Sequence, residues 1–118
     1  MTKPEFIETW RWRFAAQEAE SHALAAQARL ALNEAVTILK KHGAKRIILF
    51  GSLHQGVRFH RGSDIDLAVE GIPSQKFFRA SADLMMALDW PIDLKPLDEV
   101  DDFFRQIILQ KGEVIYAE

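Results

Sequence analysis

The sequence predicts an α+β domain in which a small mixed β-sheet packs against helices. Short strand patterns, either continuously apolar or alternating between apolar and polar residues, recur between residues 47 and 95. Segments with helical spacing lie before, between and after them. Helices and strands that intermix in a short chain are typical of one layered domain. The 118 residues are enough for one such domain and too few for two.

Residues 2 to 42 have the composition of a helix. Alanine is dense from Ala15 to Ala35, and an apolar stripe follows at helical spacing in the second half. Gly43 suits the position just after a helix. An unbroken helix of this length would measure about 60 Å at 1.5 Å per residue. We therefore expect it either to break near Ser21 or to protrude from the domain.

The first part of this helix carries a heavy aromatic load. Its large apolar residues are Phe6, Ile7, Trp10, Trp12 and Phe14. They could fold back onto the core, or they could form a surface for a partner or for a second copy of the chain. The sequence leaves these alternatives, including a homo-oligomer, open.

The remaining elements follow from periodicity. We expect strands at residues 47–50, 64–70 and 90–95 and a short edge strand at 113–117. A helix begins near Pro73 and Ser74, and its Phe and Met side chains are expected in the core. The last helix covers about 99–111, with acidic residues in its first turn. Because we find no repeat and no linker, we expect one domain over 1–118, with 1–27 as an additional helical segment and 28–118 as the core.

Composition excludes several classes of function. The chain has no cysteine, so disulfides, zinc–thiolate sites and thiol nucleophiles are ruled out. No apolar run is long enough to span a bilayer, and the N-terminus does not resemble a secretory signal. We therefore expect a cytoplasmic protein without membrane contact. The net charge of −2 argues against nucleic acid as a partner, so any nucleotide must be held by a local site.

The first candidate for that site is the pair Gly51-Ser52, which follows the strand that ends at Phe50. A glycine there allows a sharp turn and the close approach of a phosphate group. If Ser52 opens a helical turn, its free N–H groups point at that phosphate. Alone, this signal is weak, because a Gly-Ser pair after a strand is usually just a turn.

The second candidate is Asp64-Ile65-Asp66. Alternation along a strand places both carboxylates on one face, with their backbones about 7 Å apart. Their mutual repulsion would disappear if they bound a divalent cation such as Mg²⁺, which prefers oxygen ligands. The alternative is a strand face that is simply exposed to water.

The third candidate is Asp93, which lies between Ile92 and Leu94 and so on the polar side of its strand. If that strand lies beside the one that carries Asp66, the three aspartates share one cleft. Carboxylates beside a phosphate-binding turn suit phosphoryl or nucleotidyl transfer with two metal ions about 3.5–4 Å apart. A carboxylate could also accept the proton of an attacking hydroxyl.

As a set, Gly51-Ser52, eleven intervening residues and Asp64-x-Asp66 resemble the signature of the DNA polymerase β-like nucleotidyltransferase superfamily. The sequence is most similar to its minimal nucleotidyltransferases, many of which are antitoxins paired with a helical HEPN-domain toxin. The resemblance covers about residues 28 to 118, including Asp93 and the segment that ends at Tyr116.

The resemblance implies a polymerase β-like core with an extended N-terminal helix, and it implies roles for the candidate residues. Gly51 and Ser52 would contact the triphosphate of ATP or another nucleoside triphosphate. Asp64, Asp66 and Asp93 would be catalytic and would bind the metal, with two Mg²⁺ ions expected and Asp93 as general base. The reaction would transfer AMP to a hydroxyl, for example a tyrosine of a HEPN toxin.

The sequence also departs from the family pattern. The family often has Gly-Ser-Arg-Ala-Arg-Gly where this chain has Gly51-Ser52-Leu53-His54-Gln55-Gly56. Arg58, His60 or Arg61 could supply the missing positive charge. Two functions therefore remain in view, a nucleotidyltransferase that acts as an antitoxin and a non-catalytic binding module that neutralises a helical partner by forming a complex.

Overall fold

The computed structural model describes residues 4–55, 59–60 and 62–118. Eight elements follow one another in the described chain: α1 (Pro4–Lys41), β1 (Arg46–Phe50), α2 (Gly51–Gln55), β2 (Ile65–Glu70), α3 (Ser74–Ala87), β3 (Ile92–Pro96), α4 (Asp102–Lys111) and β4 (Glu113–Ala117). The expected α+β class is confirmed. Within the described residues, no helix combines the length and hydrophobicity that a membrane span needs.

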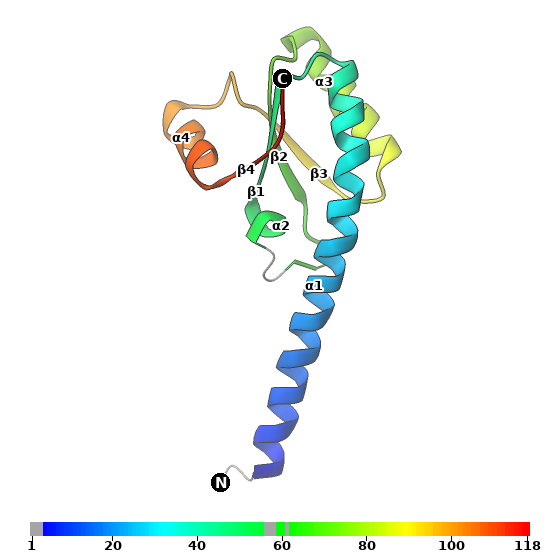
Figure 1. Ribbon diagram of the computed structural model, residues 1–118, viewed down its shortest axis with the longest axis vertical. Coiled ribbons are helices and arrows are strands. Elements are labelled where there is room, and N and C mark those ends of the chain that lie inside the picture. Colours follow the sequence, from blue (N-terminus) through cyan, green and yellow to red (C-terminus); the bar gives the residue numbers. More distant parts are fainter. Residues whose placement is uncertain (1–3, 56–58, 61) are drawn as a thin grey trace.

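The strands form one mixed sheet in the order β3-β2-β1-β4. β1 runs antiparallel to both β2 and β4, whereas β2 and β3 are parallel. The parallel pair requires a crossover, and α3 provides it. β4 lies at an edge of the sheet, as the sequence predicted (Figure 1).

Helices cover both faces of the sheet. Alternate residues of β1 and β2 point to one face, where Ile47, Leu49 and Leu67 pack against α1 and α3. The residues between them point to the other face, where Ile48 and Ala68 pack with Ile108 of α4. Figure 1 shows α4 on the side opposite α1 and α3. The face under α4 also carries the aspartates.

α1 is unbroken and protrudes. It has 38 residues, and the molecule measures 61 × 31 × 21 Å because one half of the helix extends beyond the sheet (Figure 1). Residues 9–20 are all exposed, so this segment does not fold back onto the core. The side chains of Phe6 and Ile7 lie outside the described part. Alanine and other strong helix formers fill the Ser21 region, so nothing in the local sequence breaks the helix there.

The prediction that the Phe and Met residues of α3 form plain core is wrong in part. Leu84 and Ala80 are buried, but Phe78 is 84% exposed and Met85 is 65% exposed. Only one face of α3 contacts the sheet and α1, because α3 lies on the outside of the domain. Apolar residues on the other face therefore remain at the surface.

Candidate active site

Asp66 and Asp93 are brought together by the parallel pairing of β2 and β3. Their Cα atoms are direct partners in the register of the two strands. Because Ile65 and Leu67 are buried under α1 and α3, Asp66 must point to the opposite face of the sheet. Asp64 directly precedes β2 and is exposed. The expected adjacency of the two acid-bearing strands is therefore confirmed.

Gly51 lies against the carboxylate of Asp66. It follows Phe50, which is the antiparallel partner of Asp66, and it begins α2 with a φ of 77°. A Cβ atom added to Gly51 would overlap Oδ2 of Asp66 and lie 2.9 Å from its Cγ. Only glycine combines this backbone conformation with this closeness. The turn thus places the first amides of α2, which lack intrahelical acceptors, next to an acidic group.

The surroundings of Asp66 disfavour the ionised form of its carboxyl. Burial, followed by the charges of Asp93 and Asp64, raises the pKa of its carboxyl from 3.8 to about 6, against a smaller opposing effect from Lys95. Phe50, the strand partner of Asp66, packs its ring edge to face against Phe104 on the same side of the sheet, with 6.0 Å between centroids. A carboxylate that is desolvated and repelled by two neighbours gains the most from a bound cation.

Lys95 neutralises part of this charge. It lies two residues after Asp93 on β3, so both side chains occupy the same face of the sheet. Its ammonium nitrogen donates to both carboxylate oxygens of Asp93, at 3.1 Å each. Sequence analysis did not single out Lys95, although its spacing from Asp93 is the signal that could have found it.

The acidic residues are suited to bind a hard divalent cation with one or two carboxylate ligands. They are not arranged to supply all of its ligands from the protein. Within the part of the chain that is described, no three His, Asp or Glu side chains are arranged to hold one ion together. Mg²⁺ typically takes one or two carboxylates and fills its other positions with water and substrate phosphates. The involvement of Asp64, Asp66 and Asp93 as metal ligands therefore stays a prediction, with Asp66 as the residue whose surroundings most favour it.

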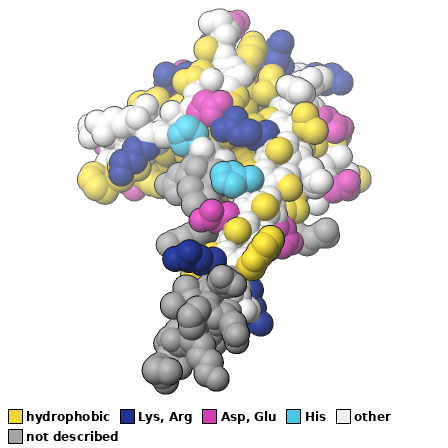
Figure 2. All heavy atoms as spheres, turned by 60° about the horizontal axis from the view of Figure 1, so that its bottom comes forward, with side chains coloured by type: hydrophobic (Ala, Val, Ile, Leu, Met, Phe, Trp, Pro, Cys, Tyr) yellow, Lys and Arg dark blue, Asp and Glu magenta, His cyan; other side chains and the backbone are white. Residues whose placement is uncertain are grey.

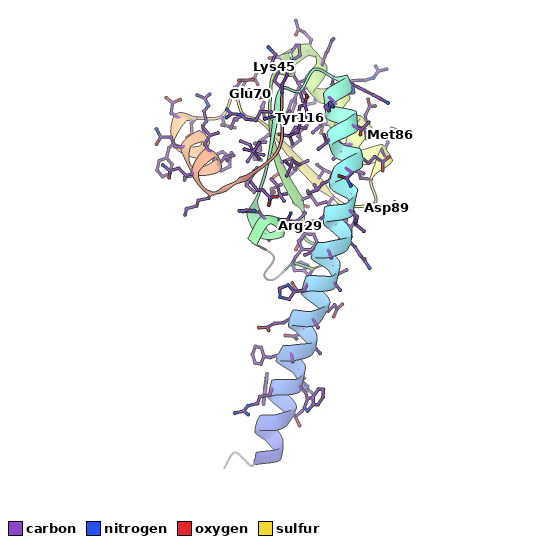
Figure 3. The ribbon with its side chains drawn as sticks, in the orientation of Figure 1. Arg29, Lys45, Glu70, Met86, Asp89 and Tyr116 are labelled. Carbon is purple, nitrogen blue, oxygen red and sulfur yellow. The ribbon has the colours of Figure 1, made fainter. Side chains whose placement is uncertain are left out.

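α2 is fixed by contacts on its other sides. Leu53 is fully buried in the core, so the position of the first missing family arginine is occupied by an anchor for α2. His54 Nδ1 lies 3.3 Å from Oε1 of Glu113, and Arg29 Nη2 donates to the same oxygen at 2.8 Å. Arg29 thus links α1 to β4 beside α2 (Figure 3). The hydrogen bond from Arg29 lowers the pKa of Glu113.

No described contact places the other predicted sources of positive charge near α2 or near the acidic residues of the site. Arg58 and Arg61 lie outside the described residues. His60 accepts the backbone N–H of Gly62 at its Nδ1, at 3.1 Å, which closes a local turn. The basic residues with described contacts at α2 are therefore Arg29, which lies beside the helix, and His54, which belongs to it.

A mixed sheet with acids on adjacent strands and a glycine turn against one of them defines a nucleotidyltransferase-type site. The family model described as "Polymerase beta, Nucleotidyltransferase" matches residues 33–118. The chain belongs to this family and is a nucleotidyltransferase. The match excludes the protruding half of α1. No curated protein is similar enough in sequence to count as a match.

Solved structures agree with this assignment. The chain is 28% identical to a crystal structure of a toxin–antitoxin with AMP-PNP, with a TM-score of 0.64 and coverage of 73% of each chain. It is similar in fold to a minimal nucleotidyltransferase structure, at 22% identity and a TM-score of 0.65, covering 75% of this chain and 93% of the other. It also matches the structure of a tri-AMPylated Shewanella oneidensis HEPN toxin in complex with MNT antitoxin, at 23% identity, a TM-score of 0.60 and coverage of 76% and 72%.

Proposed function

We propose that this protein transfers AMP from ATP to a hydroxyl group of a helical HEPN-type partner protein, and that it acts in this way as an antitoxin. The observation that carries the proposal is the contact between Gly51 and the strained carboxylate of Asp66, with Asp93 as its neighbour in the sheet. The similarity to a toxin–antitoxin structure that contains AMP-PNP supports ATP as the nucleotide. The AMPylated HEPN toxin in another similar structure suggests the acceptor.

Each residue of the site has a defined task in this proposal. The amides of Gly51 and Ser52 bind the phosphates of ATP. Asp64 and Asp66 would hold Mg²⁺, which would supply positive charge to the triphosphate. Asp93 completes the site and takes the proton from the attacking hydroxyl. The hydroxyl oxygen forms a bond to the α-phosphorus, the bond to the bridging oxygen breaks, and pyrophosphate leaves.

The hydrogen bonds from Lys95 limit when Asp93 can act as the general base. Lys95 occupies both carboxylate oxygens of Asp93, so an attacking hydroxyl can reach them only when Lys95 turns away. Lys95 is only partly buried and has a flexible stem, so it is free to reach a phosphate oxygen of the nucleotide instead.

The test combines the purified chain with α-labelled ATP, Mg²⁺ and the helical protein encoded next to it. We expect label on a hydroxyl residue of the helical protein, and we expect Asp64→Asn and Asp66→Asn to abolish it. Asp102→Asn is the matched control, because Asp102 is 91% exposed in the first turn of α4. If the helical protein is neutralised equally well by Asp64→Asn and Asp66→Asn variants without label transfer, the protein is a non-catalytic binding module and the proposal fails.

A further inference from the structure

The core-facing stripe of α1 continues beyond the domain. Within the domain, this stripe packs Leu24, Ala28 and Leu32 against the core. Towards the N-terminus, the same three- and four-residue spacing continues through Ser21, Gln17, Phe14 and Trp10. Spacings that alternate between three and four are those of a coiled-coil seam. The protruding half of α1 therefore presents a seam of the kind that pairs with another helix.

The aromatic residues of this seam are accessible. Trp10 is 47% exposed and Phe14 is 59% exposed, and their rings contact each other with 6.1 Å between centroids. Figure 2, in which the end of the helix comes forward, shows hydrophobic side chains along the visible surface of the helix. Two large aromatic residues on one protruding stripe are typical of an interaction surface.

The charges beside the seam make it complementary to itself. Arg11 and Arg13 flank its N-terminal half, whereas Glu18 and Glu20 flank its C-terminal half. An antiparallel pair centred between residues 15 and 16 places Trp10 opposite Ser21 and Phe14 opposite Gln17. In that register, both arginines of each copy lie alongside both glutamates of the other. We propose that the protruding helix pairs with the same helix of a second copy in this antiparallel register.

A cavity of about 560 Å³ supports the register. It lies where α1 enters the domain and is lined by residues that include Ser21, Leu24, Phe59 and His60. The antiparallel register brings Trp10 of the second copy to this level.

A parallel pair fits less well. From Leu24 onward, the seam is already covered by the domain of the same chain. In a parallel pair, both domains would occupy the same side of the seam at the same level. In the antiparallel pair the two domains lie at opposite ends of the seam formed by residues 10–21, and only the first turn of each helix, residues 4–7, reaches the level of residues 24–27 of the other chain. The antiparallel pair also brings two arginines against two glutamates per copy, whereas the parallel register aligns only Arg13 with Glu18.

The first experiment measures the mass of the purified full chain by sedimentation equilibrium over a range of concentrations. We expect a reversible dimer. Trp10→Ala combined with Phe14→Ala should raise the dimer dissociation constant by about tenfold or more, since both residues lie in the seam. Trp12→Ala is the matched control, because Trp12 is 76% exposed but lies on another side of the helix. It should leave the dissociation constant within about twofold.

Charge reversal tests the proposed pairing. Arg11→Glu with Arg13→Glu makes all four flanking charges acidic, and Glu18→Arg with Glu20→Arg makes them all basic. Each double variant should be monomeric because like charges then face each other, and an equimolar mixture of the two should form dimers again. These residues are exposed, so circular dichroism should show the same helix content in every variant.

Engineered disulfides test the direction, because the chain has no cysteine of its own. A mixture of Phe14→Cys and Gln17→Cys chains should form a disulfide between the two variants under oxidation, whereas Gln17→Cys alone should not cross-link. Symmetric cross-linking of Gln17→Cys would show a parallel pair and overturn the proposal. A chain that stays monomeric at all concentrations also overturns it, as does a seam that binds only a different helical protein.

Discussion

The backbone of Gly51 lies directly against the carboxylate of Asp66, so that a methyl group at residue 51 would overlap Oδ2. This contact joins the turn after β1 to the acid-bearing strand β2. It explains why a glycine and an aspartate that are fifteen positions apart belong to one site. A phosphate bound at the amides of this turn would therefore lie beside a cation bound by the Asp66 carboxylate.

Gly51→Ala should therefore damage both folding and activity. The alanine would have to keep a φ of 77°, which L-residues rarely adopt. Its Cβ atom would also displace the Asp66 carboxylate. We expect a loss of about 1–3 kcal/mol in the free energy of unfolding, together with loss of nucleotide transfer. Urea denaturation measures the first effect. Gly62→Ala is the control, since its Cβ atom would meet only the ring of His60 at 3.3 Å. Equal stability of the two variants would contradict this explanation.

Asp66→Asn should stabilise the protein at neutral pH while abolishing activity. The folded-state pKa of Asp66 is raised from 3.8 to about 6, so the folded state holds this proton more tightly than the unfolded chain does. The contribution of Asp66 to stability therefore falls as the pH rises from about 4 to about 6 and stays low above that. Removing the charge should add about 1–2 kcal/mol at pH 7 and close to nothing at pH 4.

Denaturation curves of wild type and Asp66→Asn at pH 4 and pH 7, recorded without divalent cations, give the comparison. Asp102→Asn should show no such gain at pH 7, because its side chain is exposed and far less affected by burial. A gain in Asp66→Asn that is as large at pH 4 as at pH 7 would mean that charge is not its cause.

Sequence patterns predicted most of this site because strand periodicity decides which face a residue occupies. Ile65 and Leu67 direct Asp66 to the face opposite the main core, and Ile92 and Leu94 do the same for Asp93. The order of the strands could not be derived from periodicity alone. It depends on the crossover through α3, which makes β2 and β3 parallel neighbours.

The points that sequence patterns left open or predicted wrongly have a different origin. Whether the first half of α1 protrudes and whether Phe78 is buried depend on what surrounds a helix, not on its own pattern. Apolar residues at helical spacing look the same before and after the domain ends. Alternation along β3 already placed Lys95 on the same face as Asp93, but it could not show that the two side chains are bonded.

Magnesium should stabilise the protein in a pH-dependent way. If Asp66 is a ligand, Mg²⁺ competes with the proton that the carboxyl binds with a pKa of about 6. We expect 10 mM Mg²⁺ to raise the melting temperature at pH 7.5 and to have little effect at pH 5. Asp66→Asn should lose the effect at both pH values, whereas Asp102→Asn should keep it. A rise of equal size in wild type and Asp66→Asn would place the ion elsewhere.

Lys95→Met should show that the ammonium group of Lys95 neutralises part of the carboxylate charge that a bound metal ion would otherwise neutralise. Without divalent cations, this variant leaves Asp93 without its counter-ion and removes the charge that holds down the pKa of Asp66. Because the Lys95–Asp93 pair is more than one third exposed, the loss of stability should be at most about 1 kcal/mol at pH 7. Lys95→Arg, which keeps the charge, should lose less. In 10 mM Mg²⁺ the deficit of Lys95→Met should shrink, since the ion supplies the missing positive charge to the same carboxylates. A deficit that Mg²⁺ leaves unchanged would show that Lys95 stabilises β3 for reasons unrelated to the acidic site.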